Sequence, residues 1–359
     1  MKYVVAQVHP VLCLNKQAFI DAIDTKVSSI IEETGPVDLI IFPEALGLWM
    51  CLMTPSTKLS QIFSRFLHKH QENVIKLTSI ANQTDNQDYT DSAVVNLQFA
   101  RPKDMSQYVS AASNANVLTS LSLLPEYQIS AAEEPLKRSK WANKIAKIAE
   151  WVFMKVPLRF LAQYFRSEEM FQTYCDAFGT ASKKYNLYIQ GGSIFKREVG
   201  GVKNIAYTFD PEGNICCTQE KRHPIPFESM IGIKEGQGLQ TWEIGDIKCG
   251  IAICADLNFE HDLVEELTLE NCRFIASPSG GLVPSHIWKF DYEQDVKNAQ
   301  EARAKECGVE IGRSYNAGDL LEGMLKFQGL STIVNKSGLV SIVPEDKIFE
   351  EYNLVGELK

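Results

Sequence analysis

The sequence predicts an α/β fold, and three stretches near its beginning carry the prediction. Residues 2–8 form a short apolar run typical of a buried strand. Residues 16–34 place apolar side chains at helical spacing, and residues 38–42 form a second apolar run that stops at Pro43. A strand, a helix and a strand in this order are the repeating unit of an α/β sheet, which carries its chemistry just beyond the strand ends. Glu44 occupies such a place.

The same alternation returns in the second half of the chain. A helix is predicted at 168–184, and strands at 204–209 and 215–217 are separated by the sequence Asp-Pro-Glu-Gly, a turn typical of a hairpin. The other predicted elements are strands at 187–192, 240–244, 247–253, 272–277, 308–313 and 329–334 and helices at 259–269 and 290–306. No internal repeat or low-complexity tract interrupts this pattern.

Residues 52–170 combine helical and polar character and differ from the rest of the chain. Because this segment has an apolar periodicity of its own, we expect an insertion or subdomain and not a linker. Within it, residues 137–160 carry seven basic residues and a single acid, Glu150. A basic amphipathic helix can lie in a membrane interface or dock on an acidic partner, although most such helices pack on the core of their own protein.

Charge and cysteine content argue against several classes of function. A formal net charge of −9 argues against nucleic acid as the main partner, because phosphate binding needs a positive surface. The nine cysteines are an odd number without C-x-x-C pairs, which favours a reducing compartment over a disulfide framework or a zinc site. No stretch approaches the ~18 apolar residues of a membrane-spanning helix. We therefore expect a cytoplasmic protein without metal or cofactor, with peripheral membrane association through 137–160 as an alternative.

Three side chains form a candidate catalytic set. Cys254 lies where the predicted strand 247–253 breaks and runs into a helix. A nucleophile on such a turn is exposed to substrate and lies near helix N-terminal amides, which can lower the pKa of its thiol. Glu44 follows a strand, and Lys221 follows the hairpin. Taken alone, Cys254 could be a packed thiol, Glu44 a loop carboxylate and Lys221 a surface lysine. Only their joint occurrence indicates a site.

Three motifs resemble those that carry the catalytic glutamate, lysine and cysteine, in that order, in the nitrilase (carbon-nitrogen hydrolase) superfamily. They are Asp38-Leu-Ile-Ile-Phe-Pro-Glu44, Gln219-Glu-Lys221-Arg-His-Pro and Cys249-Gly-Ile-Ala-Ile-Cys254-Ala-Asp-Leu-Asn-Phe-Glu260. The resemblance implies a single domain over residues 1–359 that folds as a four-layer α-β-β-α sandwich, with 52–170 as an inserted, mainly helical segment. It also implies that the protein pairs as a homodimer.

The resemblance further implies a role for each candidate residue. Cys254 would be the nucleophile, Glu44 the general base and Lys221 a cation that helps to hold the oxyanion. Glu228 resembles a second glutamate that many amidase-type members place near the lysine, with a surface carboxylate as the alternative. The residues expected to bind the oxyanion or the substrate are Ala255, Asp256 and Ser279.

The residues around the nucleophile favour a small-molecule amide as the substrate. Cys254-Ala255-Asp256 stands where true nitrilases have Cys-Trp-Glu, so nitrile hydrolysis is disfavoured. Asn258 stands where many amidase-type members have arginine, which argues against simple ω-amide specificity.

The expected activity is hydrolysis of a linear, non-peptide amide C–N bond through a cysteine thioester. The alternative enzyme is an N-acyltransferase that passes the same thioester to an amine, with a lipid or membrane-associated acyl substrate. A separate hypothesis is that the insertion 52–170 forms a lid or lipid-facing entry that admits a long or membrane-borne acyl substrate. A binding scaffold without catalysis is disfavoured because the glutamate, lysine and cysteine are all present.

Overall fold

The computed structural model describes residues in both halves of the chain. The described residues are 1–11, 16–46, 168–198, 200–225, 228–229, 232–257, 263–284, 292–320 and 325–359. The chain forms two compact units, the first made of Met1–Gln61, Ala162–Ile225 and Ile233–Lys359 and the second of Ile62–Leu161 and Pro226–Gly232. The basic segment 137–160, and all but the last three residues of the predicted insertion 52–170, lie outside the described residues.

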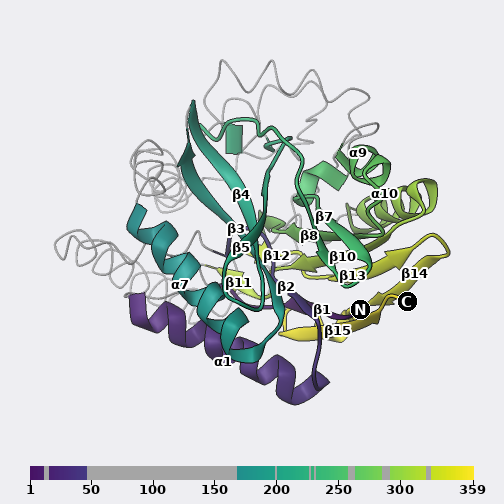
Figure 1. The fold of residues 1–359 in the computed structure, drawn as a ribbon. Coiled ribbons are helices and arrows are strands. Elements are labelled where there is room, and N and C mark those ends of the chain that lie inside the picture. The colour runs from purple at the N-terminus through teal and green to yellow at the C-terminus, as the bar shows by residue number, and fades with distance from the viewer. Residues whose placement is uncertain are drawn as a thin grey trace, which may run out of the picture. The chain divides into compact units, whose positions relative to one another are not determined.

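Six strands of the first unit form one sheet, in the order β15-β1-β2-β3-β4-β5 (Figure 1). Their bounds are β1 (Lys2–Gln7), β2 (Leu39–Ile41), β3 (Tyr188–Glu198), β4 (Gly201–Phe209), β5 (Ile215–Glu220) and β15 (Tyr352–Glu357). β1, β2 and β3 are parallel, and the other neighbours are antiparallel. The five strands predicted for this part of the chain are confirmed, whereas β15 has no counterpart among the predicted strands.

Six further strands form the second sheet, in the order β14-β13-β10-β8-β7-β6. Their bounds are β6 (Thr241–Ile244), β7 (Ile247–Ile251), β8 (Phe274–Ser279), β10 (Glu310–Tyr315), β13 (Thr332–Asn335) and β14 (Gly338–Ile342). β7, β8 and β10 are parallel at its centre. A small third sheet consists of β11 (Asp319–Leu320), β12 (Leu325–Phe327) and β9 (Leu282–Pro284).

Helices flank both six-stranded sheets (Figure 1). The first sheet carries α1 (Lys16–Thr34) and α7 (Glu168–Tyr185), and the second carries α9 (Leu263–Leu269) and α10 (Tyr292–Cys307). These bounds agree closely with the predicted helices; residues 259–262, at the predicted beginning of the third helix, lie outside the described residues. No helix in the described part of the chain is both long and apolar enough to cross a membrane.

Apolar side chains fill the space between the layers. Between the sheets, Tyr3 of β1 packs on Phe274 of β8, with 4.5 Å between the ring centroids. On the outside of the first sheet, Phe178 of α7 stacks on Phe209 of β4 at 6.0 Å. On the outside of the second sheet, side chains of α9 and α10 join those of β8 and β10 in one cluster. The predicted four-layer α-β-β-α sandwich is confirmed.

The carboxyl ends of parallel strands from both sheets lead to one place. Glu44 follows β2 of the first sheet, while Cys254 follows β7 of the second and Ser279 ends β8. The backbone N–H of Glu44 donates to the carbonyl of Ser279 at 3.3 Å. The side-chain amide of Asn316, which directly follows β10, donates to the carbonyl of Glu44 at 2.9 Å. The sandwich thus joins strand ends that are far apart in the chain.

Candidate active site

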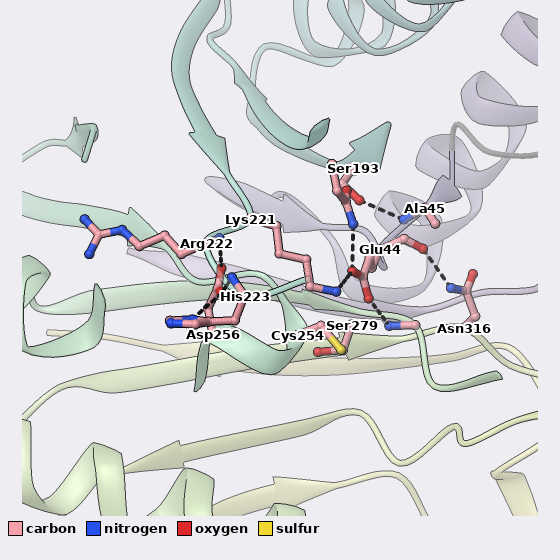
Figure 2. Close-up of polar contacts among 12 residues, drawn as sticks. Glu44, Ala45, Ser193, Lys221, Arg222, His223, Cys254, Asp256, Ser279 and Asn316 are labelled. Atoms are coloured by element: carbon pink, nitrogen blue, oxygen red, sulfur yellow. Dashed lines mark hydrogen bonds and ion pairs between the residues drawn. The ribbon is translucent and has the colours of Figure 1, made fainter. Parts of the chain in front are cut away.

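The Glu44 carboxylate accepts hydrogen bonds on both of its oxygens. Oε1 accepts from Lys221 Nζ at 2.7 Å and from Asn204 Nδ2 at 2.9 Å, and Oε2 accepts from the Gly280 backbone N–H at 2.9 Å (Figure 2). The side chain is buried, and Lys221 is only 1% exposed. Because all three partners are donors, the surroundings present Glu44 as a fixed acceptor.

The backbone that carries Glu44 is held as firmly as its side chain. The next residue, Ala45, has a φ of 57°, a left-handed conformation that is unfavourable for residues other than glycine. Its N–H donates to Ser193 Oγ of β3 at 2.9 Å. This strained turn brings the carboxylate away from the end of β2 and toward the second sheet, where the Ser279 carbonyl accepts from its N–H.

Asp256 joins the nucleophile turn to the loop that carries Lys221. Its side chain is fully buried. Oδ1 accepts from the His223 backbone N–H at 2.8 Å, and Oδ2 accepts from the Arg222 backbone N–H at 3.2 Å (Figure 2). The His223 ring Nδ1 lies 3.1 Å from the same Oδ1. These contacts support a positioning role for Asp256, which holds the two residues immediately after Lys221.

Replacing Asp256 with alanine is therefore expected to destabilise the protein and to slow catalysis. Two backbone N–H groups would lose a buried acceptor, and each loss should lower the free energy of unfolding by about 1–3 kcal/mol. Urea unfolding and turnover measure both effects. Glu266→Gln is the matched control, because Glu266 binds the exposed end of Arg222 and has a side chain that is 47% exposed. An equal loss of stability in the two variants would contradict the role assigned to Asp256.

Cys254 begins a single 3₁₀ turn, η3 (Cys254–Leu257), and has a φ of 49°. Burial and the charge of Glu44 raise the pKa of its thiol to about 11, while Lys221, Arg313 and the Gly280 backbone N–H act to lower it. The predicted lowering of the thiol pKa is therefore wrong. Its physical reason is that desolvation and a nearby carboxylate outweigh the favourable charges. A resting thiol of this kind needs a base to ionise it.

The structure brings most of the predicted site residues together. Figure 2 shows Cys254 beside Ser279, with the ends of Glu44 and Lys221 on the same side of the turn. Ala255 follows Cys254 within η3 and is buried. Ser279 Oγ accepts from the Nε of Arg313, so its hydroxyl is engaged by the protein.

Two other residues of the prediction are not assigned a position in this group. Glu228 is buried but belongs to the second compact unit, so its role stays a prediction. Asn258 lies outside the described residues. Within the described ranges, no group of three or more His, Cys, Asp or Glu side chains is arranged to hold a metal ion.

Several residues that hold the site were not predicted as site residues. They are Ser193, Asn204, Gly280, Arg313 and Asn316. Arg313 left a signal in the sequence, because a charged residue ends the predicted strand 308–313. Of the others, Ser193 and Asn204 lie within β3 and β4, while Gly280 and Asn316 directly follow strands. Small or neutral polar residues of this kind are common throughout proteins, so their residue type alone gives no such signal.

The converging groups suit covalent catalysis. A thiol can attack an electrophilic carbon, a carboxylate can take and return its proton, and an ammonium group can stabilise developing negative charge. Here each group comes from a different strand end, and Lys221 bonds directly to Glu44. The arrangement therefore brings together a partly buried nucleophile, a buried base and a buried cation.

Comparison with known sequences points to one family. The family model described as carbon-nitrogen hydrolase matches residues 98–347, which is more than half of the chain and includes Lys221 and Cys254. The chain is 25% identical over 170 residues to the omega-amidase NIT2 of Danio rerio, covering 44% of this chain and 57% of that protein. It is 37% identical over 195 residues to the probable hydrolase YhcX of Bacillus subtilis, covering 54% of this chain and 35% of that protein. The matches thus span about half or less of these relatives.

Solved structures show the same fold at low sequence identity. An amidase of the nitrilase superfamily from Nesterenkonia sp. AN1 superposes with a TM-score of 0.54 at 14% identity, covering 100% of this chain and 92% of that chain. Nit3 of Saccharomyces cerevisiae, a member of branch 10 of the nitrilase superfamily, gives a TM-score of 0.53 at 13% identity, covering 99% and 89%. One structure of the Nesterenkonia amidase is described as showing Michael addition of acrylamide at its active-site cysteine.

Proposed function

The chain belongs to the carbon-nitrogen hydrolase family, and we propose that it cleaves the C–N bond of a small linear amide through a thioester on Cys254. One observation carries the proposal. Glu44 Oε1 and Lys221 Nζ form a buried pair, 2.7 Å apart, next to the Cys254 thiol. The carboxylate raises the pKa of this thiol and the ammonium group lowers it. A base, a cation and a nucleophile are the groups that amide cleavage through a thioester requires.

The proposed reaction begins with proton transfer from the Cys254 thiol to Glu44. With a pKa of about 11 the thiol is protonated near neutral pH, so this transfer must accompany its attack on the amide carbonyl. Lys221 Nζ and the backbone N–H of Ala255 stabilise the oxyanion that forms. As the C–N bond breaks, Glu44 returns the proton to the departing amine or ammonia. The product of this half-reaction is the thioester.

Water completes the proposed cycle. Glu44 takes a proton from the water molecule as its oxygen attacks the thioester carbonyl, and the C–S bond then breaks. The carboxylic acid leaves, and the proton returns to the Cys254 sulfur. We also propose that Glu228 orients the substrate, as its likeness to the second glutamate of amidase-type members indicates.

The proposal predicts an acyl adduct on Cys254 and none on the other thiols. Mass spectrometry of the intact protein and its peptides, after mixing with short amides, ureido acids, acyl-amino acids, fatty amides and nitriles, would detect it. Cys254→Ala should lose both adduct and turnover. Cys216→Ala is the matched control, because Cys216 is also a partly buried free thiol but lies on β5; it should retain both.

The same experiment separates the competing functions. Adding an ordinary primary amine, such as ethylamine, during turnover compares transfer to an amine with transfer to water, and predominant transfer to the amine would favour an N-acyltransferase. Turnover of nitriles without turnover of amides would contradict the proposed substrate class. An adduct that survives in Cys254→Ala would contradict the proposed nucleophile.

A further inference from the structure

Arg313 is a fully buried arginine of the second sheet that the proposed reaction does not use. It lies on β10 and is 1% exposed. Its guanidinium extends across the neighbouring strand β8, where Nε donates to Ser279 Oγ at 2.8 Å. Nη2 then reaches the carbonyl oxygen of Cys254, beyond β7, at 3.4 Å. One side chain therefore contacts the ends of two adjacent strands.

The two contacted segments are those that hold the nucleophile and the base. The Cys254 carbonyl belongs to the left-handed residue that begins η3. The Ser279 carbonyl accepts from the Glu44 N–H, and the N–H of the following Gly280 donates to the Glu44 carboxylate. Arg313 thus bonds directly to the nucleophile turn. It is also linked to the base, because it bonds to Ser279, and the Ser279–Gly280 segment bonds to Glu44.

We propose that Arg313 is a positioning residue that fixes the Cys254 turn against the Ser279–Gly280 segment and so sets the approach of the thiol to Glu44. This inference rests on the proposed function. Arginine suits the task because its planar, permanently charged fork can bond acceptors on two strands at once, which a lysine ammonium does less well. The Arg313 Cζ lies over the ring of Tyr315, two residues along β10, at 4.9 Å from the ring centroid, and this cation–π contact stabilises the charge.

The charge of Arg313 also acts on the thiol itself. Among the described residues, the charged groups that act on Cys254 are Glu44 from the end of β2, Lys221 from the end of β5 and Arg313 from β10. The carboxylate raises the pKa of the thiol, and the two cations lower it. Removing the guanidinium should therefore shift thiol ionisation to higher pH as well as loosen the turn.

Alkylation of Cys254 by iodoacetamide, followed across pH by mass spectrometry, tests the proposal without a substrate. Arg313→Met should lower the alkylation rate about tenfold at a fixed pH below the midpoint, which corresponds to an upward shift of one pKa unit. Arg313→Lys keeps the charge, so its alkylation midpoint should lie close to that of the unmodified protein. Its turnover number should still be lower. Arg303→Met is the matched control, since Arg303 is a buried arginine on α10 whose Nη1 bonds Glu306, and it should leave the profile unchanged.

Turnover separates positioning from substrate recognition. With the best amide of the panel, Arg313→Lys should lower kcat and change KM little. A higher KM for carboxylate-bearing amides with an unchanged alkylation profile would overturn the proposal and make Arg313 a substrate-binding residue. Unchanged alkylation and kcat in a folded Arg313→Lys or Arg313→Met would also overturn it, with folding checked by circular dichroism. Failure of the proposed function would instead appear as no acyl adduct in the unmodified protein, and the alkylation test would still apply.

Discussion

Replacing Lys221 with methionine should lower the free energy of unfolding by about 3–5 kcal/mol and abolish turnover, because the change leaves a buried carboxylate without its cation. The Lys221 and Glu44 side chains are 1% and 7% exposed, so water cannot replace the lost partner. Urea unfolding measures the loss. Lys203→Met is the matched control, since Lys203 pairs with Glu220 at the same 2.7 Å but with side chains 15% and 20% exposed. A cost of about 1 kcal/mol or less is expected there.

The double variant Glu44→Gln/Lys221→Met separates loss of the pair from isolation of one charge. Removing both charges leaves no unpaired carboxylate, so the double variant should be more stable than Lys221→Met. Turnover should remain absent in both. If Lys221→Met lowered the free energy of unfolding no more than Lys203→Met, the Glu44–Lys221 pair would be no stronger than a partly exposed ion pair, which would contradict the prediction.

Replacing Glu44 with glutamine should lower turnover by about 10²- to 10⁴-fold, because the proposed base is removed. The thiol should respond in the opposite direction. Glu44 raises the pKa of Cys254, so its neutral replacement should move thiol ionisation to lower pH, from about 11 toward the ordinary value of 9.0. Iodoacetamide alkylation should then be faster at a fixed pH below 11, while the enzyme turns over more slowly.

Two further variants define the origin of that response. Glu44→Asp keeps the charge but shortens the side chain, so it should lower turnover without a comparable shift of the alkylation profile. Glu220→Gln removes a carboxylate from β5 that pairs with Lys203, and it should change neither measurement appreciably. A slower alkylation of Cys254 in Glu44→Gln would contradict the assigned electrostatics, because it would mean that the carboxylate had favoured the thiolate.

The elements that the sequence predicts well are those whose buried side chains recur at the regular apolar spacing of a helix or strand. Residues 16–34 place Phe19, Ile20, Ile23, Val27 and Ile30 at helical spacing, and α1 has those bounds and buries all of these side chains except Ile20. β15 could not be found in this way. Only Leu354 and Gly356 of its six residues are buried, and its partner β1 lies at the other end of the chain.

In the site, too, features that depend on local sequence could be predicted, and features that depend on distant residues could not. Glu44, Lys221 and Cys254 follow recognisable strands and motifs, so their convergence could be predicted. The pKa of Cys254 could not, because it depends on how deeply the thiol is buried and on a carboxylate 210 positions away. Arg313 could be noticed as a charge at the end of a predicted strand, but its partners Ser279 and Cys254 can be identified only when β7, β8 and β10 lie side by side.

The division of the site between two sheets has a consequence for how the protein folds. Glu44 and Lys221 follow strands of the first sheet, whereas Cys254 and Ser279 belong to the second. A chain in which only the first sheet has formed could pair the base with its lysine, yet it would hold no positioned nucleophile. Contacts between the sheets join positions far apart in the chain, 236 positions for the bond from the Gly280 N–H to the Glu44 carboxylate, and such contacts form late and slowly. Enzymatic activity should therefore report cooperative docking of the sheets, and inactivation by denaturant should coincide with global unfolding.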